Sequence, residues 1–582
     1  MKYTGFSDDR VKLFSIALII LMGLFVLRLF YLQVIMHDEY TQLARAEQQR
    51  RLVIPAERGE IYALTHNQPV KLVLNQAVYT IFADPQVVED KDKVIDVISR
   101  VAGGEMVDKA REVLKNASDE SRYVILAKGV TRKQAELIKK ETLAGVGAQT
   151  ETRRVYPEGG LASQTLGFVN AEGMGQYGIE QSLNDRLTGK DGLLQAVTDV
   201  SNVPLSIGKD NINIEPQDGE DIVLSIDRNI QSYVEDTLKK GLEKAGAKTG
   251  SAVVMNPRTG QVMAMANYPT YNPAEFFKVT DVQAFTNGVV SSPYEPASVL
   301  KTLLFATAID QGAVNRMTPY VNTDSVRVDD AVINNALKGM TGTRTMQEAY
   351  NWSLNTGSVY AAQQLGGGRI NDKARKIMYE YYHDRFGLGE TTGVEVFGEQ
   401  SGYVVEPNAA SGEGNAVRYS NMTFGQGLDV TMIQVCSAFV SIINGGNYYK
   451  PTVLAGTVDN GVYKPDTKPQ PERRTISQAT SDEMVKMAME GRKAFYDSKR
   501  DRSGYMVGGK TGTSQQIQNG KYVFNETVGT YLGFGGDTEA KYVIMVQVAA
   551  PDKKLEGGIH AGPIFTDISN WMIDYLKLQP QG

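Results

Sequence analysis

The chain has 582 residues, of which 22% are charged and 42% hydrophobic, and its net charge at pH 7 is −6. This length predicts three or four structural units, and the negative balance argues against a nucleic-acid-binding surface. The single cysteine, Cys436, excludes an internal disulfide scaffold, and no histidine stands in an HExxH-like motif, so we expect neither a metal site nor a cofactor.

An uncharged apolar segment near the N-terminus predicts a membrane anchor. Residues 13–27 carry no charge, and the apolar run continues past Arg28 as far as Leu32. A helix needs about 20 residues to cross a bilayer, and this stretch supplies them, with Arg28 near enough to one end to extend into water. A cleaved signal peptide fits less well, because bulky residues stand where a small-x-small cleavage site would be. A buried core helix is the third alternative.

The charges on either side of this segment predict its orientation. Three cations precede it, namely Lys2, Arg10 and Lys12, whereas Asp38 and Glu39 follow it. Positive residues favour the cytoplasmic side of a span. We therefore expect a cytoplasmic tail over residues 1–12, a plasma-membrane anchor over residues 13–36, and an extracytoplasmic remainder.

Residues 37–220 contain no set of side chains with an evident chemical role. A strand-like run covers residues 78–82, and a helical run covers residues 132–141. A mixed segment without catalytic motifs is most simply a spacer or docking module. We expect it to form a pedestal domain.

From residue 221 to residue 582 the patterns predict one larger α+β domain. Asp227 is a suitable helix N-cap and Gly246 a helix stop, and apolar residues recur between them at four-residue spacing: Ile230, Val234, Leu238 and Leu242. Strands are expected over residues 222–226, 251–255, 261–265 and 542–548, and a helix over residues 565–576. Helical segments before and after strands that are joined by hairpins predict an α+β domain, in which helices flank an antiparallel sheet.

Three short motifs in this domain together predict acyl transfer. In chain order they are Ser298-Val-Leu-Lys301, Ser353-Leu-Asn355 and Lys510-Thr511-Gly512. They supply a serine nucleophile, a lysine that can take its proton, a polar bridge and a cationic strand for a carboxylate. No histidine is needed for this chemistry.

The sequence around Ser298 supports its assignment as the nucleophile. Pro296 precedes it and an apolar run follows it, as at the first turn of a buried helix. Residues three apart lie on one helix face, so we expect Lys301 to reach the Ser298 hydroxyl. Burial would lower the pKa of that lysine and let it act as a base.

Each motif also occurs elsewhere in the chain, so order and context decide between the copies. The second copies are Ser206-Ile-Gly-Lys209, Ser182-Leu-Asn184 and Lys248-Thr-Gly250. Gly208 makes a helix at the first of them improbable. These copies also stand in a different order within one short stretch.

Two further patterns compete with the acyl-transfer interpretation. Residues 504–511 satisfy the phosphate-binding pattern GxxxxGK[ST], but the following residues 512–520 predict a strand and a turn rather than the helix that a P-loop needs. Glu180-Gln-Ser-Leu-Asn184 is similar to the ExxLN element of serine β-lactamases. It precedes the nucleophile instead of following the second motif, and we interpret it as a chance match.

The chain resembles the class B penicillin-binding proteins, which are monofunctional peptidoglycan D,D-transpeptidases. The resemblance extends almost from end to end. The matching elements are Arg28 to Val34, Arg58-Gly-Glu-Ile61, Tyr156-Pro157, Gly167-Phe-Val169, Gly178-Ile-Glu180, Asn256 to Gly260, Tyr294-Glu-Pro-Ala-Ser298, Phe424-Gly-Gln-Gly427 and Lys510 to Ser514. Ala297 replaces a family glycine and Val299 a family threonine. The glutamate of Tyr294-Glu-Pro is similar to that of the division-specific branch.

The resemblance implies a role for each motif residue. Ser298 would attack the penultimate D-Ala of a stem peptide, and Lys301 would be the base. Ser353 and Asn355 would relay protons and orient the peptide. Lys510 and Thr511 would hold the cleft electrostatically, and Thr513 would bind the terminal carboxylate. Gly512, between the two threonines, belongs to the same substrate-binding strand. The Ser298 and Thr513 N–H groups would form the oxyanion hole.

The same resemblance implies partners and leaves alternatives open. The expected ligands are D-Ala-D-Ala stem peptides and β-lactams, and the expected partners are a SEDS-type glycosyltransferase and other membrane proteins of cell division. An elongation-specific transpeptidase is one alternative. The others are a β-lactam-hydrolysing or β-lactam-sensing serine enzyme and an inactive scaffold of the same fold.

Overall fold

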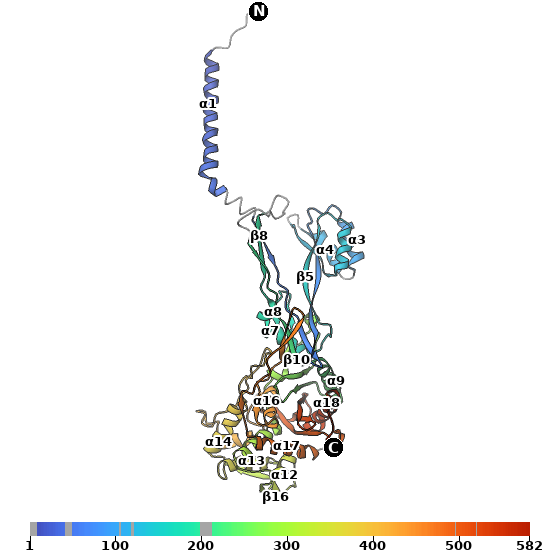
Figure 1. The fold of residues 1–582 in the computed structure, drawn as a ribbon, viewed down its shortest axis with the longest axis vertical. Coiled ribbons are helices and arrows are strands. Elements are labelled where there is room, and N and C mark those ends of the chain that lie inside the picture. Colours follow the sequence, from blue (N-terminus) through green and yellow to red (C-terminus); the bar gives the residue numbers. More distant parts are fainter. Residues whose placement is uncertain are drawn as a thin grey trace, which may run out of the picture. The chain divides into compact units, whose positions relative to one another are not determined.

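The computed structural model describes residues 8–40, 49–103, 106–117, 121–197, 212–494, 496–518 and 521–581. The chain divides into two compact units, one made of residues 1–58 and 188–219, the other of residues 59–187 and 220–582 (Figure 1). The second copy of the serine motif, Ser206 to Lys209, lies outside the described residues.

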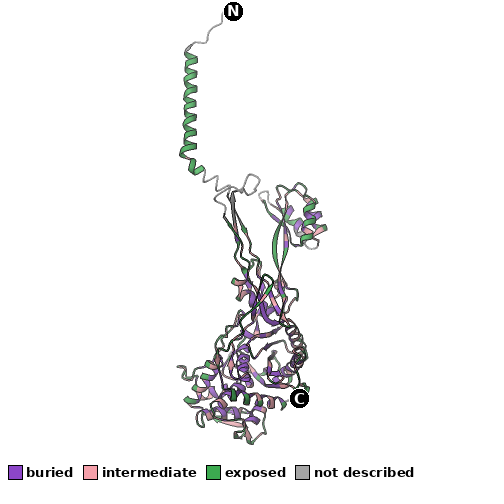
Figure 2. Ribbon diagram, viewed as in Figure 1, coloured by how far each residue is buried: buried purple, intermediate pink, exposed green. Residues whose placement is uncertain are grey.

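The first unit contains the N-terminal helix and a small sheet. The helix α1 (Asp8–Phe30) continues into a π-helical turn, η1 (Tyr31–Ile35). Figure 2 shows α1 exposed along its length, and the segment Asp9–Ile35 is long and apolar enough to cross a membrane. The antiparallel sheet has the strand order β1-β8-β9. Its strands are β1 (Gln49–Ile54), β8 (Gly192–Val197) and β9 (Ile212–Ile214).

The second unit begins with a seven-stranded mixed sheet. Its order is β19-β18-β10-β2-β3-β4, and β5 also pairs with β3. The strands are β2 (Ile61–Thr65), β3 (Gln68–Ala83), β4 (Val124–Val130), β5 (Val146–Val155), β10 (Asp221–Asp227), β18 (Leu454–Asp459) and β19 (Val462–Pro465). Because β10 lies parallel to β2, with Ile222 opposite Ile61, strands from before and after residue 220 share one sheet.

Helices cover the far end of the long strands β3 and β5. They are α3 (Lys91–Val101), α4 (Met106–Asn116) and α5 (Arg132–Lys140), and they enclose a small apolar core of their own. The predicted strand 78–82 lies within β3, and the predicted helix 132–141 is α5, whose Thr131 and Gln134 form a reciprocal capping box. Short elements follow: α6 (Ser163–Leu166), β6 (Phe168–Val169), β7 (Gly175–Gln176), α7 (Gly178–Ser182) and α8 (Asn184–Thr188).

A five-stranded antiparallel sheet forms the centre of the C-terminal part. Its order is β12-β11-β23-β22-β21. The strands are β11 (Thr249–Met255), β12 (Val262–Tyr268), β21 (Met506–Gln518), β22 (Lys521–Gly536) and β23 (Ala540–Ala549). Two helices lie side by side on one face, α9 (Arg228–Ala245) and α18 (Gly562–Tyr575) (Figure 1).

The helix α9 confirms the sequence pattern. The Asp227 carboxylate accepts N–H groups of the first turn, Gly246 ends the helix at φ +61°, and the four predicted apolar residues are buried. The predicted antiparallel α+β fold with flanking helices is therefore confirmed.

A helical lobe packs on the opposite face of this sheet and carries two of the three motifs. Its helices are α10 (Gly288–Ser291), η4 (Ala297–Leu300), α11 (Lys301–Asp310), α12 (Met346–Asn351), α13 (Asn355–Leu365), α14 (Asp372–Tyr379), η5 (Glu380–Arg385), α15 (Ala416–Met422), α16 (Met432–Ile443) and α17 (Gln478–Lys493). The largest apolar cluster among the described residues runs through this lobe, one face of the five-stranded sheet and part of the seven-stranded sheet.

Small two-stranded sheets and single turns complete the second unit. The strands β14 (Ser325–Val328) and β15 (Ala331–Asn334) form a hairpin, and two further two-stranded sheets pair β13 (Pro319–Asn322) with β16 (Gly342–Thr345) and β17 (Asn447–Tyr448) with β20 (Arg473–Arg474). The turns are η2 (Pro273–Lys278), η3 (Val282–Phe285), η6 (Tyr496–Arg500) and η7 (Gly557–Ala561).

Candidate active site

Ser298 lies in a tight turn at the start of a buried helix. Its turn is the 3-10 segment η4, and the α-helix α11 begins only at Lys301. The preceding residue, Ala297, is buried at φ +53°, a left-handed conformation, and its N–H donates to the Gly425 carbonyl at 3.1 Å. A side chain at Gly425 would collide with Ala297. The loop of the Phe424-Gly-Gln-Gly427 element is thereby held against the serine turn.

Lys301 is completely buried among acceptors of the second motif. Its Nζ donates to the Ser353 carbonyl at 2.6 Å and to Asn355 Oδ1 at 2.8 Å, and lies 3.2 Å from Ser353 Oγ. Among the residues that the structure describes, none hydrogen-bonds the Ser298 hydroxyl. The acceptors of the second motif surround Lys301 Nζ instead, and the expected reach from Lys301 to the Ser298 hydroxyl stays a prediction.

The second motif is shaped by its own backbone and by a neighbouring hairpin. Ser353 adopts φ +54°, between the helices α12 and α13. Non-glycine residues in this region are strained, and such strain tends to occur at functional sites. The Asn355 Nδ2 group donates to the Asn334 carbonyl of β15 at 2.8 Å. This bond orients the amide so that Oδ1 faces Lys301.

The third motif lies on β21, beside the other two. Lys510 Nζ donates to Ser353 Oγ at 3.0 Å and to the Thr511 carbonyl at 3.2 Å. A Cβ atom at Gly512 would lie 2.8 Å from the Pro296 carbonyl, so the glycine lets the strand pass close to the serine turn. The next residue, Thr513, is exposed, and its Oγ1 accepts the Gly557 N–H at 3.1 Å, which leaves the hydroxyl proton free to donate.

The two lysines make an electropositive centre. Neither forms an ion pair with any residue in the described part of the chain, and both are buried, Lys301 with 0% and Lys510 with 2% of its surface exposed. Burial lowers the pKa of Lys510 to about 7. Burial, together with the charge of Lys510, holds the pKa of Lys301 well below its usual range. A neutral Lys301 can act as a base, and a charged Lys510 can attract a carboxylate.

The strand β21 also argues against a nucleotide-binding P-loop at residues 504–511, which match the GxxxxGK[ST] pattern. The strand continues from Met506 to Gln518, so no helix N-terminus follows Thr511.

Comparison with known proteins gives the family. The model of the penicillin binding protein transpeptidase domain matches residues 250–570, and that of the penicillin-binding protein dimerisation domain matches residues 53–224. The chain is 30% identical to stage V sporulation protein D of Bacillus subtilis (strain 168), over 95% of this chain and 84% of that protein. The chain is a class B penicillin-binding protein.

Other relatives and a solved structure agree with this membership. Identity to the peptidoglycan D,D-transpeptidase FtsI of Escherichia coli (strain K12) is 26%, over 100% of this chain and 94% of that protein. The fold matches penicillin binding protein 2X from Streptococcus thermophilus with a TM-score of 0.73 at 24% identity, over 91% of this chain and 80% of that one. The exposed apolar helix α1 and the sequence similarity to FtsI together indicate a single-pass membrane protein of the penicillin-binding family.

Glu180 and Ser182 of the ExxLN-like element have structural contacts. The Glu180 carboxylate is fully buried and pairs with Arg154 at 2.8 Å, and Ser182 Oγ donates to the Glu395 carbonyl at 2.6 Å. The buried ion pair joins α7 to β5. The element therefore has a packing role in this penicillin-binding protein.

Sequence reasoning missed one buried carboxyl beside the nucleophile. Glu295 is 6% exposed, and its Oε1 accepts the Gly427 N–H at 2.6 Å and the Tyr522 hydroxyl at 2.9 Å. Burial raises the pKa of this carboxyl. Its position three residues before Ser298 was the available signal in the sequence. The contacts connect the serine turn to the loop at Gly427 and to strand β22.

Proposed function

We propose that the protein cross-links peptidoglycan stem peptides through an acyl-enzyme on Ser298. The observation that carries the assignment is the surroundings of Lys301. One helical turn from the serine, its buried amine contacts Ser353 and Asn355 and has a depressed pKa. A neutral lysine in that place is a suitable general base for a serine hydroxyl.

The first half-reaction would transfer the donor peptide to the enzyme. The Ser298 proton passes to Lys301 as Oγ bonds the carbonyl carbon of the penultimate D-Ala. The Ser298 and Thr513 N–H groups hold the developing oxyanion. The bond from this carbon to the terminal D-Ala nitrogen then breaks, and the departing amine takes up the proton through Lys301 and the Ser353 hydroxyl.

The terminal carboxylate of the donor would hold the substrate in place. A charged Lys510 attracts it through the site's positive potential, and the hydroxyl groups of Thr511 and Thr513 are its proposed direct contacts. Gly512 keeps this strand close to the serine turn. An amine of a second stem peptide then attacks the ester, and Ser298 regains its proton. β-Lactams imitate the D-Ala-D-Ala end and remain attached to the serine.

A pair of measurements tests this function. Purified full-length protein in detergent is incubated with a fluorescent penicillin and, separately, with a pentapeptide ending in D-Ala-D-Ala plus a fluorescent D-amino acid as acceptor. We expect labelling and D-Ala release by the wild type, and neither by Ser298→Ala. Rapid hydrolysis of nitrocefin without exchange of the terminal D-Ala would instead identify a β-lactamase.

We further propose that the protein works at the outer face of the membrane in septal wall synthesis. The name of one relative, stage V sporulation protein D, supports a role in sporulation, and the sequence resemblance supports a role in division. Three cations precede the apolar run that starts at residue 13, namely Lys2, Arg10 and Lys12, and they favour a cytoplasmic N-terminus. The proposed domains are a tail over residues 1–12, an anchor over residues 13–36, a pedestal over residues 37–220 and a catalytic domain over residues 221–582. The proposed partners are a SEDS-type glycosyltransferase and other division proteins of the membrane.

A truncated form tests the role of the anchor. A secreted protein that starts near residue 37 should still bind penicillin, but it should not support growth of cells depleted of the full-length protein. Full complementation would reduce the first 36 residues to a delivery signal. Protease added to spheroplasts should digest all but a short N-terminal fragment, and complete protection would reverse the proposed orientation.

A further inference from the structure

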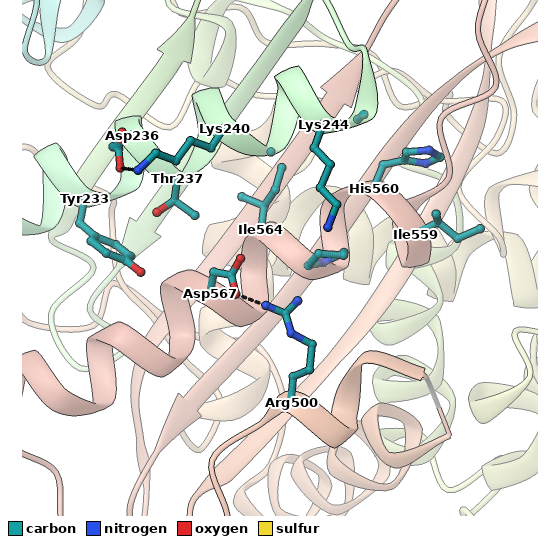
Figure 3. Close-up of a pocket in the computed structure, with 13 residues that line it drawn as sticks. Tyr233, Asp236, Thr237, Lys240, Lys244, Arg500, Ile559, His560, Ile564 and Asp567 are labelled. Atoms are coloured by element: carbon teal, nitrogen blue, oxygen red, sulfur yellow. Dashed lines mark hydrogen bonds and ion pairs between the residues drawn. The ribbon is translucent and has the colours of Figure 1, made fainter.

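A pocket between α9 and α18 lies outside the motifs of the transpeptidase reaction. Its volume is about 430 Å³, and its walls come from the C-terminal half of α9, the start of α18, the turn η7 and Arg500 of η6 (Figure 3). The two helices approach closely beneath it, since a side chain at Gly241 would collide with Ile564. None of the lining residues belongs to the three motifs.

The charges around this pocket favour an anion. Asp236 pairs with Lys240, and Asp567 pairs with Arg500, so both lining carboxylates have a cationic partner. Lys244, in the last turn of α9, forms no ion pair with the described part of the chain. Figure 3 shows Lys244 and Arg500 extending from opposite sides into the same space. Both cations line the pocket, so both would attract an oxyanion bound in it.

Apolar side chains form part of the remaining wall, next to the polar residues Thr237 and His560. Ile559, Pro563 and Ile564 line it on the side of η7 and α18. On α9 the ring of Tyr233 is fixed by stacking on Trp571 at 4.3 Å. A concave surface that combines apolar side chains with convergent charged groups can hold a small molecule that has both an apolar and a charged part. We propose that this pocket binds an oxyanion, a carboxylate or a phosphate, on a small apolar body, and that its occupancy alters acylation at the active site.

The turn η7 connects the pocket to the substrate strand. His560 lines the pocket, and its Nδ1 accepts the Glu556 N–H at 2.8 Å. The next N–H, that of Gly557, donates to Thr513 Oγ1 at 3.1 Å. A side chain at Gly557 would collide with the backbone of Gly512. One short segment therefore touches both the ligand pocket and the strand of the third motif, so a ligand that shifts it also shifts Thr513.

The binding part of the proposal does not depend on the proposed enzymatic function. Phenyl phosphate is the probe, and isothermal titration calorimetry on the full-length protein in detergent measures its affinity. Penicillin-treated protein is titrated as well, because the acyl group occupies the cleft at Lys510. Lys244→Gln should weaken binding about tenfold, as for a lost hydrogen bond to a charged group. Lys239→Gln, the same change at an exposed residue outside the pocket, should stay within about twofold.

Two results would contradict the proposed binding site. One is an equal affinity of the Lys244→Gln and Lys239→Gln variants for phenyl phosphate, and the other is the absence of saturable phenyl phosphate binding by the wild type. Benzyl alcohol, which lacks the phosphate, should bind far more weakly, and equal binding of both probes would overturn the claim for an oxyanion.

The coupling is tested by the rate of penicillin acylation. Saturating phenyl phosphate should change this rate by at least about fivefold, both in the wild type and in Lys239→Gln. A fivefold change lies at the lower end of the usual range of allosteric couplings. The Lys244→Gln variant should not respond at the same probe concentration. An unchanged wild-type rate would refute the coupling, and an equal response of Lys244→Gln would show that the probe acts elsewhere.

Discussion

Replacing Lys510 by methionine should stabilise the protein while it removes activity. The Lys510 ammonium is 2% exposed and has no carboxylate partner among the described residues. Burial lowers its pKa from 10.5 to about 7. A buried lysine of this kind is a stability cost that remains because the reaction needs its charge. Methionine has a similar length and carries no charge.

The size of the effect follows from the shift in the pKa. At pH 7 the unfolded chain holds the lysine proton firmly, whereas the folded protein is about half deprotonated. The shift therefore costs about 4 kcal/mol of folding free energy at this pH. The substitution also removes two hydrogen bonds, to Ser353 Oγ and to the Thr511 carbonyl, worth about 1 kcal/mol each. The net stabilisation is about 2 kcal/mol.

The sign of the pH dependence gives a second check. Between about pH 7 and 10.4 the unfolded chain binds more protons than the folded one, so the stability of the wild type rises with pH. The advantage of Lys510→Met should accordingly shrink as the pH is raised from 7 toward 10. Where the lysine is neutral in both states, only the two lost hydrogen bonds count, and Lys510→Met should be about 2 kcal/mol less stable than the wild type.

Calorimetric thermal unfolding at pH 7 and pH 9.5 measures both effects. A gain of about 2 kcal/mol should raise the melting temperature by about 2–3 °C for a domain of roughly 360 residues. Lys510→Arg is the matched control, since it keeps the buried charge and should not stabilise. A Lys510→Met variant less stable than the wild type at pH 7, or equally affected at both pH values, would refute this account of the buried lysines.

Three further predictions concern the base, the pH profile and the ExxLN-like element. Lys301→Ala should retain its fold and lose acylation by β-lactams by about 100-fold or more, whereas a loss of only a few-fold would reduce Lys301 to a packing residue. The rate of acylation should fall as the pH rises above about 7, because Lys510 then loses its charge. The rate should also fall at lower pH, because Lys301 then becomes protonated. Stopped-flow acylation rates that keep rising to pH 9 would contradict the role of Lys510. Glu180→Gln should cost about 3–5 kcal/mol in urea unfolding, because it breaks a buried ion pair, and a normal stability with altered β-lactam hydrolysis would assign Glu180 a chemical role instead.

The sequence predicted those features of the fold that depend on neighbouring residues. The limits and buried face of α9 followed from Asp227, Gly246 and the spacing between them, because capping and helical periodicity are local. The hairpin of β11 and β12 followed from turn residues between two apolar runs. The pairing of β10 with β2 is a long-range contact without a local signal, and the sequence did not indicate it.

The candidate site was predictable in its members but not in its bonds. Motif order favoured a set of residues whose members Lys301, Ser353 and Lys510 lie in contact in the structure. The acceptors around Lys301 depend on the left-handed backbone at Ser353, and the orientation of Asn355 depends on the Asn334 carbonyl of a separate hairpin. Helical spacing placed Lys301 on the face of Ser298, but it could not indicate that the amine also contacts Ser353 and Asn355. Glu295 was missed for a similar reason, since its partners come from residue 427 and residue 522.

The most direct test of the proposed mechanism is the position of the β-lactam adduct. Wild-type protein is treated with benzylpenicillin, digested with trypsin and analysed by tandem mass spectrometry, and the adduct should be found on Ser298 and persist for minutes or longer. The Ser298→Ala variant should carry no adduct. An adduct on Ser206, in the second copy of the serine motif, would contradict the assignment of the nucleophile and with it the proposed roles of Lys301, Ser353 and Lys510.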